Sequence, residues 1–273
     1  MSLARDSSER YVEEAHCLLQ DLCKAGISAQ VQLPNMTLRD KLLPPNCTSV
    51  DFALLPLKEP RRPGAYGARI DRVSAVHTCP FAETLALDND IHILNASRVL
   101  GWFDHLKSST SISGIRAPVG VPKGHETKRV PSSFGEINGG VLFLRCPRVQ
   151  PILDSWLSEL QHKTSKDGHD QMPLRISVYK HRGSFEYAPA NVMCRTVWKS
   201  SCALVHDHDR VNCPSRIRSP TPTNLVKSIV PTPSSFLRVD LWDSFTVTGA
   251  PMLATAAIGC IICCRRRNAK WGQ

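Results

Sequence analysis

The chain has 273 residues, 42% of them hydrophobic, which favours one large domain with extra segments over two equal domains. Its formal net charge of +10 is spread along the chain, without zinc-finger spacing and without aromatic residues interleaved among basic ones. These features argue against a nucleic-acid partner.

The eleven cysteines are scattered, and their odd number without close pairs argues against a disulfide framework. We therefore expect reduced thiols with mostly structural roles. Cys260 and Cys263 form a C-x-x-C pair, but the surrounding stretch is apolar and contains no second ligand pair, so we expect no zinc site there.

The N-terminal sequence MSLARDSSERYVEEAHCLL lacks the apolar core that a secretory signal needs. It predicts a cytoplasmic or membrane-associated protein with no N-terminal signal peptide. Three N-x-S/T motifs occur, at Asn35, Asn46 and Asn95, and outside the secretory pathway they are not expected to be glycosylated.

Hydrophobic periodicity predicts helices and strands in the first third of the chain. Residues 8–25 have helical spacing, and Gly26 is suited to end that helix. The elements that follow are, in chain order, strands at 27–33 and 49–55, a helix through Ile70, Val73 and Val76, and a buried strand at 84–87. This last strand ends in Asp88, Asn89 and Asp90.

The alternation continues to about residue 211. It comprises, in chain order, a turn and strand at 135–145, helices at 149–163 and 170–180, a segment at 187–195, and a short strand that ends in the polar residues 206–209. Strands alternating with helices predict a three-layer α/β/α domain with a mainly parallel central sheet. In such sheets ligands bind beyond the carboxyl ends of the strands, where the polar residues 88–90 and 206–209 are expected to lie.

Two carboxylates, Asp88 and Asp90, stand one residue apart at a strand end, which is costly unless something neutralises them. Divalent ions prefer oxygen ligands, and a D-x-D pair can hold an ion that also binds a substrate diphosphate. The alternative interpretation is a solvated turn, since this short motif is common by chance.

Five segments in order resemble the nucleotide-diphospho-sugar transferase group, glycosyltransferases of the GT-A fold that include a glycogenin-like branch. The segments are RVSAVHTCPFAETLALDNDIHIL, FGEINGGVLFLR, GHDQMPLRISVYK, YAPANVMCR and ALVHDHDR. The resemblance covers roughly residues 11–210. It implies a Rossmann-like fold and a hexosyltransferase-like enzyme that moves a sugar from a nucleotide-diphosphate donor, expected to be UDP-linked, to an unknown acceptor.

The resemblance also implies a Mn²⁺ or Mg²⁺ site. Asp88 and Asp90 match the metal-binding pair, and Asp88 also matches a position near the nucleotide ribose. His206 matches the late histidine that completes the metal site, and His208, two residues along, remains an alternative.

Four further residues match positions around the donor. Arg72 takes the basic position, often lysine in the family, that contacts donor phosphate or sugar, while Asn138 and Gly139 match the motif that lines the donor sugar. Asp170 and Gln171 match the catalytic pair beside the sugar and the acceptor. The structural alternatives are a surface arginine at 72, a tight turn at 138–140, and a helix N-cap at Asp170.

The sequence departs from the family pattern at both ends of the match. Only MSLAR precedes the first predicted helix, so the first strand of the fold, which helps to hold the nucleotide base, is expected to be short or missing. HDHDR also lacks the small residue usual after the late histidine. A catalytically degenerate protein that binds nucleotide sugars, or serves as a scaffold, is therefore an alternative function.

The C-terminal part divides by composition into a Pro/Ser-rich linker or tail at 212–243 and a segment at 244–273, after a transferase-like domain at 1–211. Residues 244–264 carry no charge and precede three arginines, which is typical of a membrane anchor with cytoplasmic arginines. Cysteines there are candidate palmitoylation sites. The alternatives are a tail packed on the domain or, as a function, a membrane-anchored interaction protein.

Overall fold

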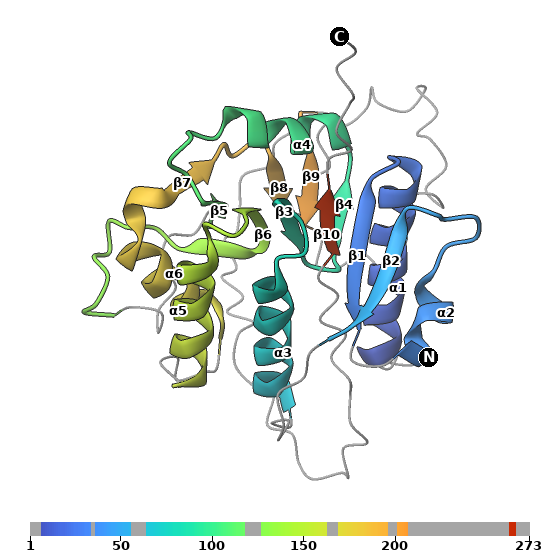
Figure 1. Ribbon diagram of the computed structural model, residues 1–273, viewed down its shortest axis with the longest axis horizontal. Coiled ribbons are helices and arrows are strands. Elements are labelled where there is room, and N and C mark those ends of the chain that lie inside the picture. Colours follow the sequence, from blue (N-terminus) through green and yellow to red (C-terminus); the bar gives the residue numbers. More distant parts are fainter. Residues whose placement is uncertain are drawn as a thin grey trace, which may run out of the picture.

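The computed structural model describes residues 7–33, 36–55, 64–117, 127–162, 169–195, 201–206 and 262–265. The helices are α1 Ser7–Lys24, α2 Arg39–Leu42, α3 Gly64–Thr78, α4 Ala96–His105, α5 Gln150–Gln161 and α6 Gln171–Lys180. The strands are β1 Ser28–Leu33, β2 Val50–Leu54, β3 Glu83–Leu87, β4 Ile91–Ile93, β5 Ile112–Arg116, β6 Ile137–Arg145, β7 Phe185–Ala188, β8 Met193–Arg195, β9 Leu204–His206 and β10 Ile262–Arg265. Figure 1 shows their arrangement.

A seven-stranded sheet with the order β2-β1-β10-β3-β6-β5-β7 forms the centre of the fold, and β4-β9-β8 form a second sheet. Strands β2, β1, β3, β5 and β7 run in one direction, while β10 and β6 run in the other. The α/β class and the mainly parallel strand direction are therefore confirmed. Because the two reversed strands stand between the others, most neighbouring pairs are nonetheless antiparallel.

Helices cover both faces of the central sheet. Side chains alternate along a strand, so Leu85 and Leu87 of β3 face the core on the side of α1 and α4, and Ala86 faces the core formed with α3, α5 and α6. Phe143 and Leu142 of β6 divide in the same way. Burial on both faces explains why these strands are apolar throughout, and it produces the three layers.

The residue types at two helix ends agree with the structure, although only the first of them was used to predict a helix. Gly26 has the left-handed φ of 62°, which glycine adopts without strain, directly after α1. Helix α4 was not predicted, although its N-cap signal is present: the Asn95 carboxamide oxygen accepts a hydrogen bond of 2.9 Å from Arg98 N. Strands β4 and β5 were not predicted either: β4 has three residues, and Ser113 and Gly114 interrupt the apolar pattern of β5.

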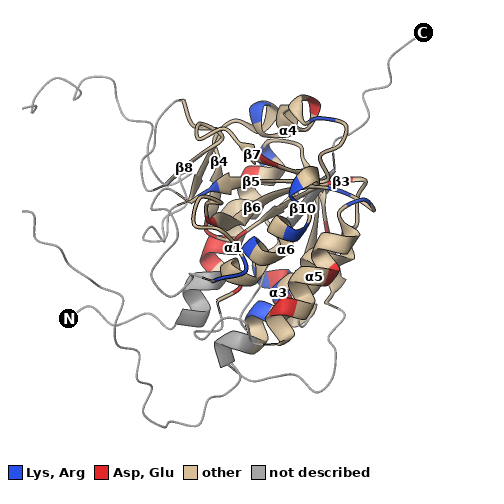
Figure 2. Cartoon of the chain, turned by 90° about the vertical axis from the view of Figure 1, so that its left-hand side faces the viewer, with Lys and Arg blue, Asp and Glu red and all other residues tan. Residues whose placement is uncertain are grey.

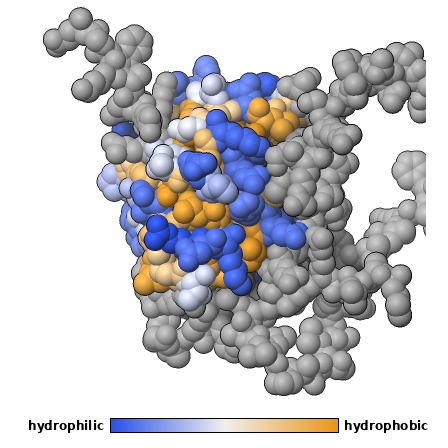
Figure 3. Space-filling view, turned by 90° about the vertical axis from the view of Figure 1, so that its right-hand side faces the viewer, coloured by the Kyte–Doolittle hydropathy of each residue, from blue (hydrophilic) through white to orange (hydrophobic). Residues whose placement is uncertain are grey.

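Charged residues of both signs lie on several helices and connections, while the strands of the central sheet are mostly uncharged (Figure 2). On the side formed by α1, α2 and β2, hydrophilic and hydrophobic residues are intermixed (Figure 3). In the view of Figure 2, basic and acidic residues are interspersed and do not gather into one basic patch.

Strand β10 comes from the far C-terminal part of the sequence and lies between β1 and β3. It pairs antiparallel with both, so Ile262 stands opposite Val31 on one side and Leu87 on the other. Residues 262–264 end the uncharged stretch that resembles a membrane anchor, and here they occupy the centre of the sheet. The remainder of 244–273 and the linker at 212–243 lie outside the described residues.

Among the described helices, none combines the length and the apolar character that crossing a bilayer requires.

The expectation of reduced thiols is wrong for seven of the described cysteines. Three disulfides, with Cα–Cα separations of 5.7, 6.1 and 5.8 Å, join Cys23 to Cys47, Cys79 to Cys146, and Cys194 to Cys202. Cys17 is disulfide-bonded as well. The partners are 24, 67 and 8 residues apart in sequence, so their pairing depends on how the elements pack and the spacing did not indicate it.

Candidate active site

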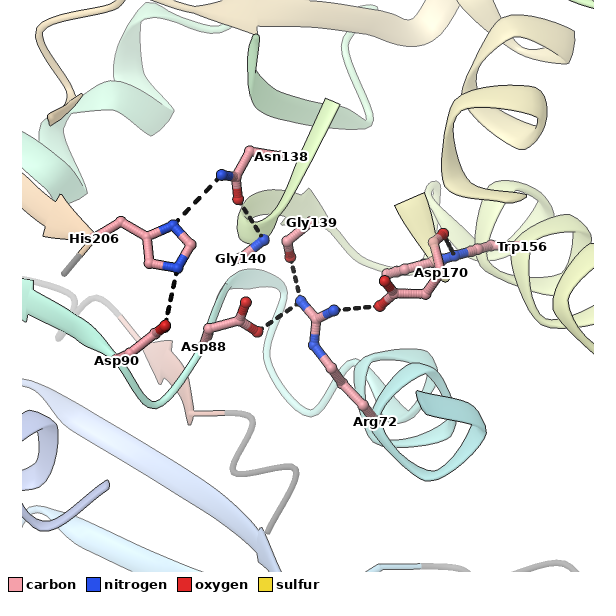
Figure 4. A network of polar contacts seen from close by, with 9 residues as sticks. All are labelled: Arg72, Asp88, Asp90, Asn138, Gly139, Gly140, Trp156, Asp170 and His206. Carbon is pink, nitrogen blue, oxygen red and sulfur yellow. Dashed lines mark hydrogen bonds and ion pairs between the residues drawn. The ribbon is translucent and has the colours of Figure 1, made fainter. Parts of the chain in front are cut away.

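The candidate site begins at the carboxyl end of β3, where the main chain turns from Leu87 into Asp88. Strand β6 pairs antiparallel with β3, with Leu87 opposite Val141, and Asp88 N donates a hydrogen bond of 2.8 Å to Gly140 O. The start of β6 therefore lies beside the acidic turn (Figure 4). This juxtaposition follows from the register of two strands that are more than fifty residues apart in the chain.

The second sheet brings His206 to the same place. Ile91, the residue after Asp90, pairs with His206 in the antiparallel β4–β9 ladder. As a result, His206 Nε2 lies 3.1 Å from the Asp90 carboxylate. One ligand atom from each of Asp88, Asp90 and His206 lies within 4.8 Å of the others. His208, the alternative ligand, lies outside the described residues.

Arg72 reaches into this cluster from α3 and contacts three elements at once (Figure 4). Its Nη2 lies 2.7 Å from Asp88 Oδ1 and donates a 2.5 Å hydrogen bond to Gly139 O, and its Nη1 forms an ion pair with Asp170. The side chain is only 17% exposed, so the alternative of a surface arginine is wrong. Burial opposes the charged form, but Asp88 and Asp170 more than offset it and hold the pKa of Arg72 above its ordinary value.

Asp170 precedes α6, yet its side chain does not cap the helix. The carboxylate is directed instead to Arg72, and the main-chain oxygen accepts a 2.9 Å hydrogen bond from Trp156 Nε1. Asp170 is buried, and these two contacts fix the orientation of its side chain and of its main chain. Gln171 is the partly buried first residue of α6, and within the described part of the chain no hydrogen bond joins it to the cluster.

Residues 138–140 belong to strand β6, so the alternative of a tight turn does not hold. Asn138 Oδ1 accepts a 2.7 Å hydrogen bond from Gly140 N, and Asn138 Nδ2 lies 3.4 Å from His206 Nδ1. When Nδ2 donates to that nitrogen, His206 carries its proton on Nε2 and donates it to Asp90, and binding of a metal ion at Nε2 would displace that proton. Asn138 therefore orients His206 as well as the strand.

Gly140 is a residue of the site that sequence reasoning missed. A Cβ atom there would lie 2.7 Å from Asp88 Oδ2 and 3.0 Å from Asn138 Oδ1, whereas at Gly139 its nearest neighbour would be Arg72 at an ordinary 3.5 Å. Only at position 140 is the absence of a side chain required for the close approach. The sequence Asn138-Gly139-Gly140-Val141 contained this signal, because Gly140 stands two residues after the asparagine.

The cluster holds more acidic than basic groups. Three carboxylates, those of Asp88, Asp90 and Asp170, lie around one guanidinium. Burial, with Asp90 nearby, raises the pKa of Asp88 above its ordinary value, although Arg72 opposes the shift. Two carboxylates and an imidazole in this arrangement fit a divalent cation such as Mn²⁺ or Mg²⁺, because oxygen donors predominate.

Comparison with known structures identifies the fold. The galactosyltransferase LgtC, solved with donor and acceptor sugar analogues, superposes with a TM-score of 0.51 at 14% identity, over 72% of this chain and 84% of that one. Mouse xyloside xylosyltransferase 1 gives 0.45 at 17% identity, over 73% and 93%. A glycosyltransferase involved in glycosylation of the major capsid of PBCV-1 gives 0.45 at 12%, over 75% and 88%.

No protein-family model matches the chain, and no curated protein does. The likeness to LgtC is one of fold. The chain thus has the GT-A fold of nucleotide-sugar glycosyltransferases, as the resemblance in its sequence implied.

Proposed function

We propose that the protein is a metal-dependent glycosyltransferase that moves a sugar from a nucleotide-diphosphate donor, UDP-linked in the first instance, to a still unknown acceptor. The observation that carries the proposal is the gathering of Asp88, Asp90 and His206 at the carboxyl end of β3, with Arg72 beside them. Ligands of open α/β sheets bind at this edge. LgtC, which has the same fold, was solved with both a donor and an acceptor sugar analogue.

In this proposal Asp88, Asp90 and His206 hold Mn²⁺ or Mg²⁺, and the bound ion supplies Lewis-acid stabilisation of the charge on the departing diphosphate. Among the described residues, Arg72 contacts this cluster and is proposed to contact the same phosphates, and its position is preorganised by Asp88, Asp170 and Gly139 O. A preorganised guanidinium stabilises developing charge without having to be reoriented during the reaction.

The remaining residues position the sugar and the acceptor. We propose that Asn138, with Gly139 and Gly140, lines the donor sugar, because these residues begin β6 beside Asp88. Asp170 and Gln171 begin α6 on the other side of Arg72 and are proposed to contact the sugar and the acceptor. The transferase domain is proposed to comprise residues 1–211 together with strand β10.

A calorimetric titration of UDP, with and without Mn²⁺, tests the proposal directly. We expect wild-type binding to require Mn²⁺ and to be lost in Asp90→Asn. Asp154→Asn is a matched control, because Asp154 is 62% exposed on α5 and pairs with His77. Its binding should equal that of the wild type.

A folded wild-type protein that bound neither UDP nor GDP would contradict the enzyme proposal and favour the degenerate scaffold. Strand β10 lies between β1 and β3, runs antiparallel to both, and comes from the C-terminal part of the sequence. Membrane contact through the C-terminal segment also stays a prediction.

A further inference from the structure

We propose that this protein matures in the oxidising lumen of the secretory pathway and carries an N-linked glycan on Asn46. The inference does not depend on the proposed transferase function, because it rests on the disulfides and on one surface turn. It differs from the cytoplasmic location that the N-terminal residues predict.

The disulfides provide the first part of the argument. Each links two elements that also pack together: α1 to the segment before β2, the end of α3 to the end of β6, and β8 to the segment before β9. Persistent disulfides form in oxidising compartments and are rare in the cytosol, where reducing systems keep thiols free. Three bridges in one domain, with Cys17 bonded as well, therefore indicate folding outside the cytosol.

The glycosylation motif Asn46-Cys47-Thr48 provides the second part. It lies in the turn between α2 and β2, where Cys47 N donates a 3.2 Å hydrogen bond to Pro44 O. Asn46 and Thr48 are both exposed, and Asn46 has a left-handed φ of 62° that belongs to a turn. A glycan on Asn46 can therefore project into solvent without displacing packed atoms.

The disulfide and the motif share a residue, which ties the two observations together. Cys47 stands between Asn46 and Thr48, and its bridge to Cys23 holds the turn against α1. The other described motif differs, because the Asn95 carboxamide caps α4. Asn35 lies outside the described residues.

The chemistry requires two reagents of that compartment. In each bridge two thiols lose two protons and two electrons to a disulfide oxidant, which is reduced to its dithiol. On Asn46, the side-chain nitrogen forms a bond to C1 of an oligosaccharide carried on a lipid diphosphate. The bond from C1 to the diphosphate oxygen breaks, the lipid diphosphate leaves with the electron pair, and the amide proton passes to a base.

The test uses full-length protein purified from cells that make it, with free thiols alkylated at lysis. Peptide mass spectrometry should find the Cys79–Cys146 and Cys23–Cys47 peptides linked until reduction. Enzymatic removal of N-glycans in heavy-oxygen water should convert Asn46 to a heavy-labelled aspartate. Alkylated Cys79 and Cys146 in the native protein, or an unmodified Asn46, would overturn the proposal.

Two variants separate a glycan on Asn46 from one elsewhere. Thr48→Ala destroys the motif and should remove one glycan-sized step in the electrophoretic mobility shift that the deglycosylating enzyme produces. Thr48→Ser restores the hydroxyl group that the motif requires and should retain that step. Because residue 48 is exposed, both variants are expected to fold. An equal shift in both variants would show that Asn46 is not the modified residue.

Discussion

The two ends of strand β3 differ in how their polar groups are satisfied. At the amino end, Glu83 lies 3.7 Å from Arg145, and the Cys79–Cys146 bridge joins the flanking segments covalently. At the carboxyl end, Asp88 and its acidic neighbours outnumber the one guanidinium that contacts them. One end is thus balanced within the chain, whereas the other has a negative excess that a bound cation can neutralise.

The largest expected effect on stability comes from removing the disulfide at the amino end of β3. The double substitution Cys79→Ser with Cys146→Ser opens a loop of 67 residues. The free energy of unfolding should fall by roughly 4 kcal/mol, because the unfolded chain regains the entropy that this cross-link removes. Denaturant unfolding without reductant measures the change. UDP binding by the folded fraction should be unchanged, and its loss would mean that the two ends are not independent.

Arg72→Met tests the other end. It leaves Asp88 and Asp170 without their shared cation in a buried setting, so we expect a loss of about 3 kcal/mol in the free energy of unfolding near neutral pH, together with loss of UDP binding. The pKa of Asp88 is raised by burial even with Arg72 present, and without Arg72 it should rise further. Protonation then removes the unpaired charge, so the difference from wild type should shrink as pH falls. A difference independent of pH would exclude this cause.

The variants Gly140→Ala and Gly139→Ala compare two neighbouring positions at the carboxyl end of β3, of which only one lies against Asp88. The methyl group at 140 would approach Asp88 Oδ2 to 2.7 Å and displace that carboxylate, whereas at 139 the nearest atom is 3.5 Å away. We expect Mn²⁺ affinity to fall roughly 10- to 100-fold for Gly140→Ala and little for Gly139→Ala. Titration calorimetry with Mn²⁺ alone measures both. Equal affinities in the two variants would place the ion away from Asp88.

The smallest effect is expected at a charged cluster outside the site. Glu159 on α5 pairs with Arg129 and Lys180, both about half exposed. Burial opposes its charge, but these hydrogen bonds prevail and hold the pKa of Glu159 below its ordinary value. Its contribution is therefore present above that ordinary value and is lost as pH falls through the lowered one.

Glu159→Gln should accordingly cost about 0.5–1 kcal/mol near neutral pH, and less as the solution becomes acidic. Urea unfolding at several pH values measures this dependence. UDP binding should be unaffected, because the cluster is not part of the site. A binding defect as large as that of Asp90→Asn would show that UDP binding does not depend specifically on the acidic residues at the carboxyl end of β3.

Hydrophobic periodicity was sufficient to predict the long helices and strands, because the spacing of apolar residues in each depends only on neighbouring residues in the chain. Helix α1 was predicted at 8–25 and found at Ser7–Lys24, and β6 was predicted within 135–145 and found at Ile137–Arg145. Strand β4 contains too few residues for a period to show, and Gly114 interrupts the apolar pattern of β5. The apolar composition of the segment that contains β10 left a membrane anchor and a tail packed on the domain open as alternatives, because composition alone does not separate the two.

The sequence by itself predicted the α/β class and the long helices and strands, since spacing and composition are local properties, and its resemblance to a known family named Asp88, Asp90 and Arg72 as candidate residues. Tertiary structure alone decided that Ile91 pairs with His206, that Gly140 lies against Asp88, and that Cys79 meets Cys146. Those contacts join residues far apart in the chain. They depend on strand register and helix packing, which no short window of sequence contains.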